Sequence, residues 1–172
     1  WATRVWWMIY VLGYTNVSVL NGGLKEWKRR NYNLEPCENF YLETAFSSTE
    51  NQGFFVGKEQ ILNSKNDNNC FLINALTSDI HKGESTRYGR PGRIPSSINI
   101  PFSDLMDINT HMLKSPKEAL SIFEKHNITQ DSEILNYCGG GIAATLNAFV
   151  LRQLGFEKLK VYDNSLSEWA MD

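Results

Sequence analysis

The chain has 172 residues, of which 42% are hydrophobic and 21% charged, and its formal net charge is −2 at pH 7. This length can bury a sizeable core, and the weak charge gives no reason to expect a nucleic acid or an anionic membrane as a partner. No apolar run reaches the roughly 18 residues that a membrane span needs. The three cysteines are not clustered, so they predict neither a disulfide framework nor a metal site. Such cysteine usage suits the reducing cytoplasm, where we expect the protein.

Residues 1–35 predict a helix, a short strand and a second helix. The first helix should end at Gly13, a strand should follow over 17–20, and the second helix should run from Leu24 to the basic end at Arg30 after a Gly-Gly turn. The apolar face of the first helix is expected at Val5, Ile9 and Leu12, widened by Trp6 or Met8. Three tryptophans are expected in the core: Trp6, Trp7 and Trp27. These elements make only half of an α/β layer, so we expect a further segment upstream.

Residues 36–52 are polar, contain Pro36 and show little periodicity, so we predict a linker there. From residue 53 onward helical and strand patterns alternate. Helices are predicted over 56–63, 116–126, 143–154 and 165–171, and strands over 71–75, 97–100, 134–137 and 159–162. Such alternation predicts an α/β fold with a mostly parallel sheet and helices on both faces. Ligands of such sheets bind beyond the carboxyl ends of the strands.

The segment 83–95 concentrates three arginines, three glycines and two prolines in one loop. A guanidinium group offers a planar fork of donors to carboxylate, sulfonate or phosphate oxygens, so the loop is a candidate anion-binding element. A solvated surface loop is the alternative for any single arginine. The candidate residues are Arg87, Arg90 and Arg93.

Cys138 follows the predicted strand 134–137 and precedes three glycines and a helix start. Glycines permit backbone conformations in which successive N–H groups turn toward one point, and the positive end of the helix adds to them. Such surroundings lower the pKa of a cysteine and favour its reactive thiolate. Cys138 as a buried small hydrophobe in a tight turn is the alternative, whereas Cys37 suits a connector and Cys70 the core. The backbone cradle would be formed by Gly139, Gly140, Gly141, Ile142 and Ala143.

With these segments in view, the chain resembles the tandem-domain rhodanese family of sulfurtransferases, which includes thiosulfate and mercaptopyruvate sulfurtransferases. The motifs that carry the resemblance are RVWW at 4–7, VLNGGLKEW at 19–27, LINA at 72–75, GRIP at 92–95, INIPF at 98–102, CGGG at 138–141 and VYDNS at 161–165. The resemblance implies that residues 1–35 end a first, non-catalytic domain and that 53–172 form the catalytic domain.

The resemblance also implies a reaction through a cysteine persulfide. Cys138 would attack the sulfane sulfur of a donor such as thiosulfate, and a thiol or cyanide would then accept that sulfur. Covalent catalysis of this kind splits one transfer into two steps, and the cradle would stabilise the anionic sulfur. A reaction of this kind requires no metal or organic cofactor. Its partners would be a small-molecule sulfur donor and a thiol or cyanide acceptor.

Several positions depart from the family pattern. The strand that usually ends in Asp-Ala-Arg reads Asn74-Ala75-Leu76, so a common arginine is missing. Gly139 and Gly140 replace the Arg-Lys pair of thiosulfate enzymes and the serine of mercaptopyruvate enzymes, which leaves the donor open. Arg93 stands where a histidine usually precedes Ile-Pro. We expect the arginines of the 83–95 loop to supply the missing positive charge.

Two alternatives differ in class. Related cysteine phosphatases need an arginine six residues after the cysteine, where this chain has Ala144, so phosphatase activity is not expected. A non-catalytic sulfane-binding or regulatory module is the other alternative, favoured by Asn74 and Leu76 and opposed by the intact cradle.

The three histidines fall in polar segments expected to be exposed, and none is assigned as a general base: His81, His111 and His126. Ser165, Glu168 and Trp169 lie beyond the last strand and stay outside the predicted site.

Overall fold

The computed structural model describes residues 1–49, 51, 53–64, 67 and 69–171. One five-stranded sheet organises this part of the chain, and all its neighbouring strands pair in parallel. The strand order is β1-β5-β4-β2-β3. The strands are β1 (Phe55–Val56), β2 (Cys70–Asn74), β3 (Ile98–Asn99), β4 (Glu133–Tyr137) and β5 (Leu159–Tyr162). The predicted parallel α/β sheet is therefore confirmed.

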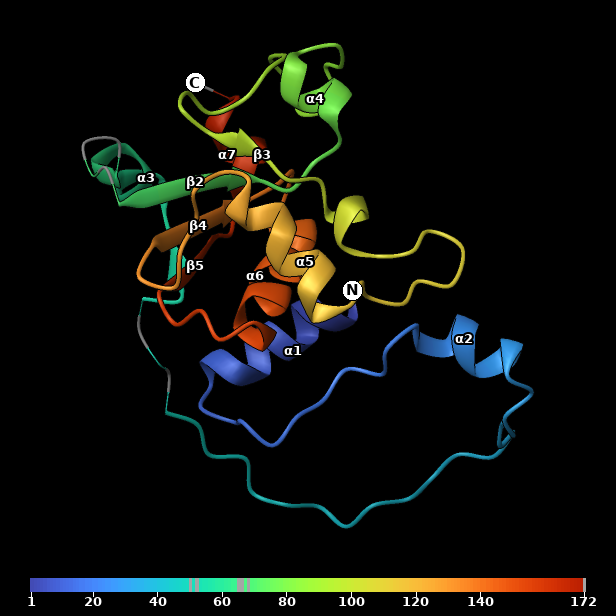
Figure 1. The fold of residues 1–172 in the computed structure, drawn as a ribbon. Helices are drawn as coiled ribbons and strands as arrows, with labels where there is room; N and C mark the ends of the chain where they lie inside the picture. The colour runs from blue at the N-terminus through green and yellow to red at the C-terminus, as the bar shows by residue number, and fades with distance from the viewer. Residues whose placement is uncertain (50, 52, 65–66, 68, 172) are drawn as a thin grey trace.

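Helices cover both faces of this sheet. In Figure 1, α1, α5 and α6 lie together on one face, while α3 and α7 lie on the other. The helices are α1 (Ala2–Val11), α2 (Gly23–Arg29), α3 (Lys58–Ser64), α4 (Ser78–Lys82), α5 (Pro116–Glu124), α6 (Ile142–Gln153) and α7 (Ser165–Trp169), with a 3-10 turn η1 (Phe102–Leu105). No helix in the described part of the chain is long and apolar enough to cross a membrane.

The core lies between α6 and the sheet. Strands buried on both faces read as apolar runs, and β4 is such a strand, with Ile134, Leu135 and Tyr137 each no more than 2% exposed. α6 buries more than half of its residues because α1 packs on its outer side. The α5 helix begins with a capping box between Ser115 and Glu118, which holds the first turn of the predicted helix.

The α1 helix packs on α6 through a different face from the one predicted. Trp6 and Trp7 are buried as expected, and the Trp6 ring meets Phe149 edge-on at 4.8 Å between centroids. Val5 is 53% exposed and Met8 46% exposed, which contradicts the predicted apolar face. The large tryptophan rings decide the orientation, since they bury more apolar area than valine and methionine would.

The segment 14–20 forms no strand, contrary to the prediction. The carbonyl of Val17 instead accepts a hydrogen bond of 3.0 Å from the Trp6 indole, which satisfies that buried donor. The predicted helix over 56–63 begins two residues later, at Lys58, because Val56 belongs to β1. The short helix α4 was not predicted.

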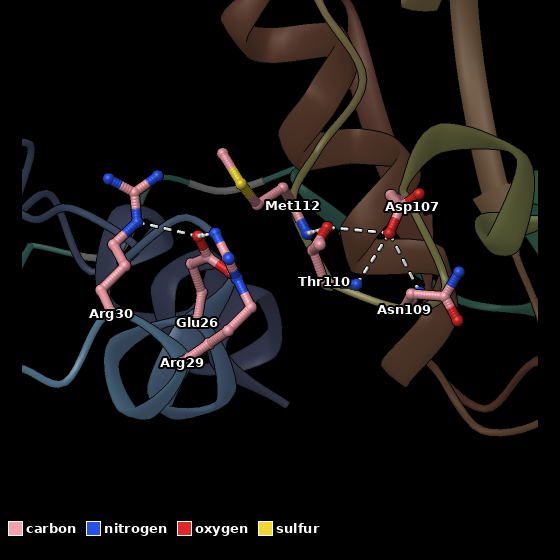
Figure 2. A network of polar contacts seen from close by, with 7 residues as sticks. All are labelled: Glu26, Arg29, Arg30, Asp107, Asn109, Thr110 and Met112. Atoms are coloured by element: carbon pink, nitrogen blue, oxygen red, sulfur yellow. Dashed lines mark hydrogen bonds and ion pairs between the residues drawn. The ribbon is translucent and has the colours of Figure 1, made fainter.

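The α2 helix lies at the edge of the molecule and is held by its own charges. Figure 2 shows Glu26 between the guanidinium groups of Arg29, at 2.6 Å, and Arg30, at 2.8 Å, which hold the pKa of Glu26 at about 2. Trp27 does not enter the core, contrary to the prediction. Its ring packs on Tyr32 with 4.9 Å between centroids.

A tight turn faces the start of α2. The carboxylate of Asp107 accepts hydrogen bonds from the amides of Asn109 and Thr110, and the Thr110 hydroxyl accepts one from the Met112 amide (Figure 2). In Figure 2, Glu26 pairs with arginines of its own segment and Asp107 binds residues of its own turn, so each cluster holds its segment in shape.

Residues 32–49 contain no helix or strand and run as an extended arc away from the sheet (Figure 1). Phe40, Tyr41 and Leu42 are each at least 86% exposed. The proposed division into residues 1–35, a linker at 36–52 and a domain at 53–172 stays a prediction. The α1 helix packs into the same hydrophobic core as residues 53–172.

Candidate functional site

Cys138 lies directly after β4, at the carboxyl end of the central part of the sheet. The α6 helix begins at Ile142, so Cys138 and the three glycines form the connection between a buried strand and a helix. Cys138 is 2% exposed, whereas Cys37 is exposed and Cys70 is half-buried. Burial raises the pKa of Cys70 to about 11. The edge of the sheet where ligands bind in parallel α/β folds is therefore occupied by Cys138.

The 138–141 loop is held by hydrogen bonds to Ser165, the first residue of α7; we call these contacts the clamp. The Ser165 hydroxyl accepts hydrogen bonds from the amides of Cys138 (3.0 Å) and Gly141 (3.3 Å) and donates one to the carbonyl of Tyr162 (2.7 Å). Ser165 is fully buried and has a φ of 52°, a conformation that costs a non-glycine residue energy. The packing around the site maintains that strained conformation.

The next two residues of α7 complete the clamp. The amide of Leu166 donates to the carbonyl of Cys138 at 3.1 Å, and both the amide and the hydroxyl of Ser167 donate to the carbonyl of Gly139. These contacts occupy the carbonyls of Cys138 and Gly139, and they leave loop amides that could donate to another acceptor. Because the Gly141 amide already donates to Ser165, we limit the predicted anion cradle to the amides of Gly139, Gly140, Ile142 and Ala143.

The three glycines differ in the reason for which glycine is needed. A Cβ on Gly139 would lie 2.0 Å from Cζ of Tyr88. Gly141 has a φ of 73°, and a Cβ there would lie 2.7 Å from the backbone oxygen of Asp163. Gly140 is exposed, and a Cβ there would meet nothing closer than 3.8 Å. Position 140 alone has room for a side chain.

The three predicted arginines separate into two groups. Arg90 donates to the carbonyls of Trp169 and Ala170 at 3.3 Å each, and Arg93 donates to the carbonyl of His81 at 3.3 Å. Arg87 is exposed, and its guanidinium group lies 5.5 Å from the ring centre of Tyr88. Of the three, Arg87 is therefore the one that packs on a residue covering the loop.

A fourth arginine, absent from the predicted site, lies beside Gly141, whereas Tyr88 lies beside Gly139. Arg4 comes from α1, forms an ion pair with Asp163 and lies 5.0 Å from the ring centre of Phe55. A Cβ on Gly141 would lie 2.8 Å from its Nη1 atom. The partners are 159 positions apart in sequence, so no local pattern could have paired them.

The aspartate of the family pattern is replaced by Asn74, which forms a polar pair with His81 at the end of β2. Asn74 at the end of β2 is fully buried, accepts a hydrogen bond from the Leu76 amide at 2.9 Å and donates to Nδ1 of His81 at 3.1 Å. His81 must be neutral at Nδ1 to accept this bond. Its pKa is lowered by burial and by the nearby Arg93 charge. His81 is half-buried, which contradicts the exposure expected from its sequence surroundings.

A hollow of about 420 Å³ opens beside Gly140. Its lining mixes charged and polar side chains: Arg4, Asp163, Asn164, Ser167 and Glu168, with Met171. Glu168 also accepts a hydrogen bond from the hydroxyl of Tyr162, which ties α7 to β5. The described residues include no group of three or more His, Cys, Asp or Glu side chains placed to hold a metal ion.

Comparison with known proteins agrees with this geometry. The model of the rhodanese-like domain family matches residues 60–172. The chain is 31% identical to mouse 3-mercaptopyruvate sulfurtransferase over 99% of its own length and 58% of the relative's. It is 29% identical to rat thiosulfate sulfurtransferase, covering 98% of this chain and 58% of that one.

A solved structure leads to the same family. The crystal structure of SseA from Escherichia coli, a 3-mercaptopyruvate sulfotransferase with the rhodanese fold, superposes with a TM-score of 0.81 and 29% identity over 95% of this chain and 61% of that one. The chain thus spans about three fifths of the length of the relatives that it matches. Fold, loop and sequence together place the chain in the rhodanese-like domain family.

Proposed function

We propose that this chain carries the sulfur-transfer site of a sulfurtransferase and that Cys138 is its nucleophile. The observation that carries the proposal is the position of Cys138, at the carboxyl end of β4 in a loop whose carbonyls are tied to α7. Its relatives named as 3-mercaptopyruvate and thiosulfate sulfurtransferases support the reaction class. The partners would be a small-molecule sulfur donor and a thiol or cyanide acceptor.

The proposed reaction has two displacements. The Cys138 thiolate attacks the outer sulfur of thiosulfate, the S–S bond of the donor breaks, and sulfite leaves with the electron pair. Cyanide or a thiolate then attacks the outer sulfur of the persulfide, and the Cys138 thiolate is restored. The amides of Gly139, Gly140, Ile142 and Ala143 would stabilise the anionic sulfur, because their dipoles are fixed before the reaction begins.

Ser165 would act in this reaction as a positioning residue. Its hydroxyl holds the amides of Cys138 and Gly141, which fixes both ends of the reactive loop. A loop that is already ordered loses little entropy when the donor binds. The proposed catalytic cysteine therefore depends on a residue 27 positions later in the chain.

A non-catalytic sulfane-binding module is a second candidate, and one observation favours it. Leu76, which is 6% exposed, stands at the position where the family pattern has an arginine, and Asn74 is fully engaged with His81 and Leu76. These two positions therefore offer an anionic donor no charge. Such a module would form the persulfide but pass it on slowly.

Intact-protein mass spectrometry distinguishes these candidates. The protein is incubated with thiosulfate or 3-mercaptopyruvate and then with cyanide, beside Cys138→Ser and the control Cys70→Ser. Gain of one sulfur atom that cyanide removes, in the wild type and in Cys70→Ser only, supports the transferase. A persulfide that persists with acceptor indicates the binding module. Sulfur gain in Cys138→Ser would contradict both.

A further inference from the structure

Tyr88 covers the reactive loop on one side. A Cβ built on Gly139 would lie 2.0 Å from its Cζ atom and 2.3 Å from its hydroxyl oxygen, so the far end of the ring rests directly on the loop backbone. A side chain at position 139 would require the Tyr88 ring to move. The Tyr88 ring therefore occupies the volume in which a residue at 139 would stand beside Cys138.

The segment that carries Tyr88 is attached to the helix that clamps the loop. Arg90 donates to the carbonyls of Trp169 and Ala170, and a Cβ on Gly89 would lie 3.5 Å from the carbonyl oxygen of Ala170. Arg87 stacks on the Tyr88 ring. The position of Tyr88 is thus fixed on one side by the bonds of Arg90 to the end of α7 and on the other by the guanidinium group of Arg87.

The two sides of the loop consequently differ in access. The Gly139 side is closed by an aromatic ring, whereas Gly140 is exposed and borders the hollow of about 420 Å³. Cys138 itself is 2% exposed. The ring blocks approach to the sulfur from the Gly139 side, so Tyr88 narrows the access of a reagent to the side of Gly140.

We propose that Tyr88 is a specificity-determining residue, whose ring over Gly139 restricts the donors that reach Cys138 to small anions. This inference rests on the proposed sulfur transfer. Thiosulfate and other compact donors with the charge close to the sulfane sulfur pass the ring. Donors with an aromatic group next to that sulfur are excluded, because they need the volume that the ring fills.

Kinetics with two donors test the proposal. Cyanide-dependent turnover is measured with thiosulfate and with benzenethiosulfonate for the wild type, Tyr88→Phe and Tyr88→Ala. We expect Tyr88→Ala to raise kcat/KM for benzenethiosulfonate about tenfold, because the aromatic group of the donor can occupy the volume that the tyrosine ring vacates. The value for thiosulfate should rise less than the value for benzenethiosulfonate, so the ratio of the two values is the readout. Tyr88→Phe keeps the ring and should match the wild type.

Alkylation of Cys138 provides a readout that needs no sulfur transfer. The rates with iodoacetamide and with N-phenyliodoacetamide are measured by peptide mass spectrometry, which separates Cys138 from Cys37 and Cys70. Tyr88→Ala should raise the rate of the phenyl reagent about tenfold relative to iodoacetamide. If the alkylation result holds but no donor yields a persulfide, the proposed reaction fails and the restriction by Tyr88 stands.

A double-mutant test checks the contact itself. Gly139→Ala should lower the urea midpoint, and Tyr88→Ala in the same chain should restore most of the loss, whereas Gly140→Ala should need no rescue. Persulfide formation with equal donor preference and equal alkylation rates in the wild type and Tyr88→Ala would overturn the inference while leaving the proposed function intact. Failure of Tyr88→Ala to rescue Gly139→Ala would also overturn it.

Discussion

Replacement of Ser165 by alanine would remove the hydroxyl group on which the reactive loop rests. That oxygen accepts two amide hydrogen bonds, from Cys138 and Gly141, and donates one to Tyr162. Alanine fits the same space, because Ser165 is fully buried and only one atom is lost. The change therefore isolates the hydrogen bonds from the packing.

The magnitude follows from these three bonds. Each hydrogen bond contributes about 1 kcal/mol net, and a buried donor left without a partner costs about 1–3 kcal/mol. We expect Ser165→Ala to lower the free energy of unfolding by about 3 kcal/mol, which corresponds to a fall in Tm of about 6–12 °C for a chain of this size. Persulfide formation at Cys138 should slow as well, since the loop loses its order.

Ser165→Gly is the matched control. It loses the same hydrogen bonds, but glycine adopts the φ of 52° without strain, so it should be about 1 kcal/mol more stable than the alanine variant. Urea unfolding followed by tryptophan fluorescence measures all three proteins. If the free energy of unfolding of the alanine variant lies within about 0.5 kcal/mol of the wild type, Ser165 does not hold the loop, because only surface substitutions are usually tolerated so well.

Three further predictions concern the loop, the buried histidine and the core. Gly141→Ala should cost at least about 1 kcal/mol of stability because of its positive φ and the Asp163 carbonyl, while Gly140→Ala should cost less than about 0.5 kcal/mol; paired urea titrations compare them. The lowered pKa of His81 predicts that stability is complete above pH 6.5 and falls below it, as the unfolded chain takes up the proton; His81→Gln should flatten this dependence in urea midpoints measured from pH 7 to 5. Trp7→Ala should lower stability by about 3–5 kcal/mol, because its ring is fully buried, and an exposed control, Trp1→Ala, should stay near the wild type in thermal melts.

The sequence predicted the elements whose signal is local and long. β4, α5 and α6 lie within two residues of their predicted bounds, because each has a continuous apolar run or a 3.6-residue period and a clear start or stop. The position of Cys138 followed from this pattern, since a strand that leads into glycines and a helix places its last residue at the edge of the sheet. β1 has only two residues, which is too short for any period to show.

The errors and omissions come from contacts between distant residues. The 17–20 segment was predicted as a strand, but its carbonyls accept hydrogen bonds from the Trp6 indole and the Gly23 amide. Arg4 and Tyr88 join the loop from other elements, so their roles depend on the fold rather than on their neighbours in sequence. The positive φ of Ser165 could not be predicted from the sequence, because serine does not usually adopt this conformation.

The clamp on Cys138 sets an order of events during biosynthesis. Ribosomes add roughly 5–20 residues per second, so the 27 positions that separate Cys138 from Ser165 take about 1–5 s to make. During that interval the nascent chain carries the cysteine without the hydroxyl that fixes its amide. A product of premature termination before residue 165 would keep the thiol but could not order the loop. The order of the 138–141 loop therefore depends on translation of the segment that carries Ser165.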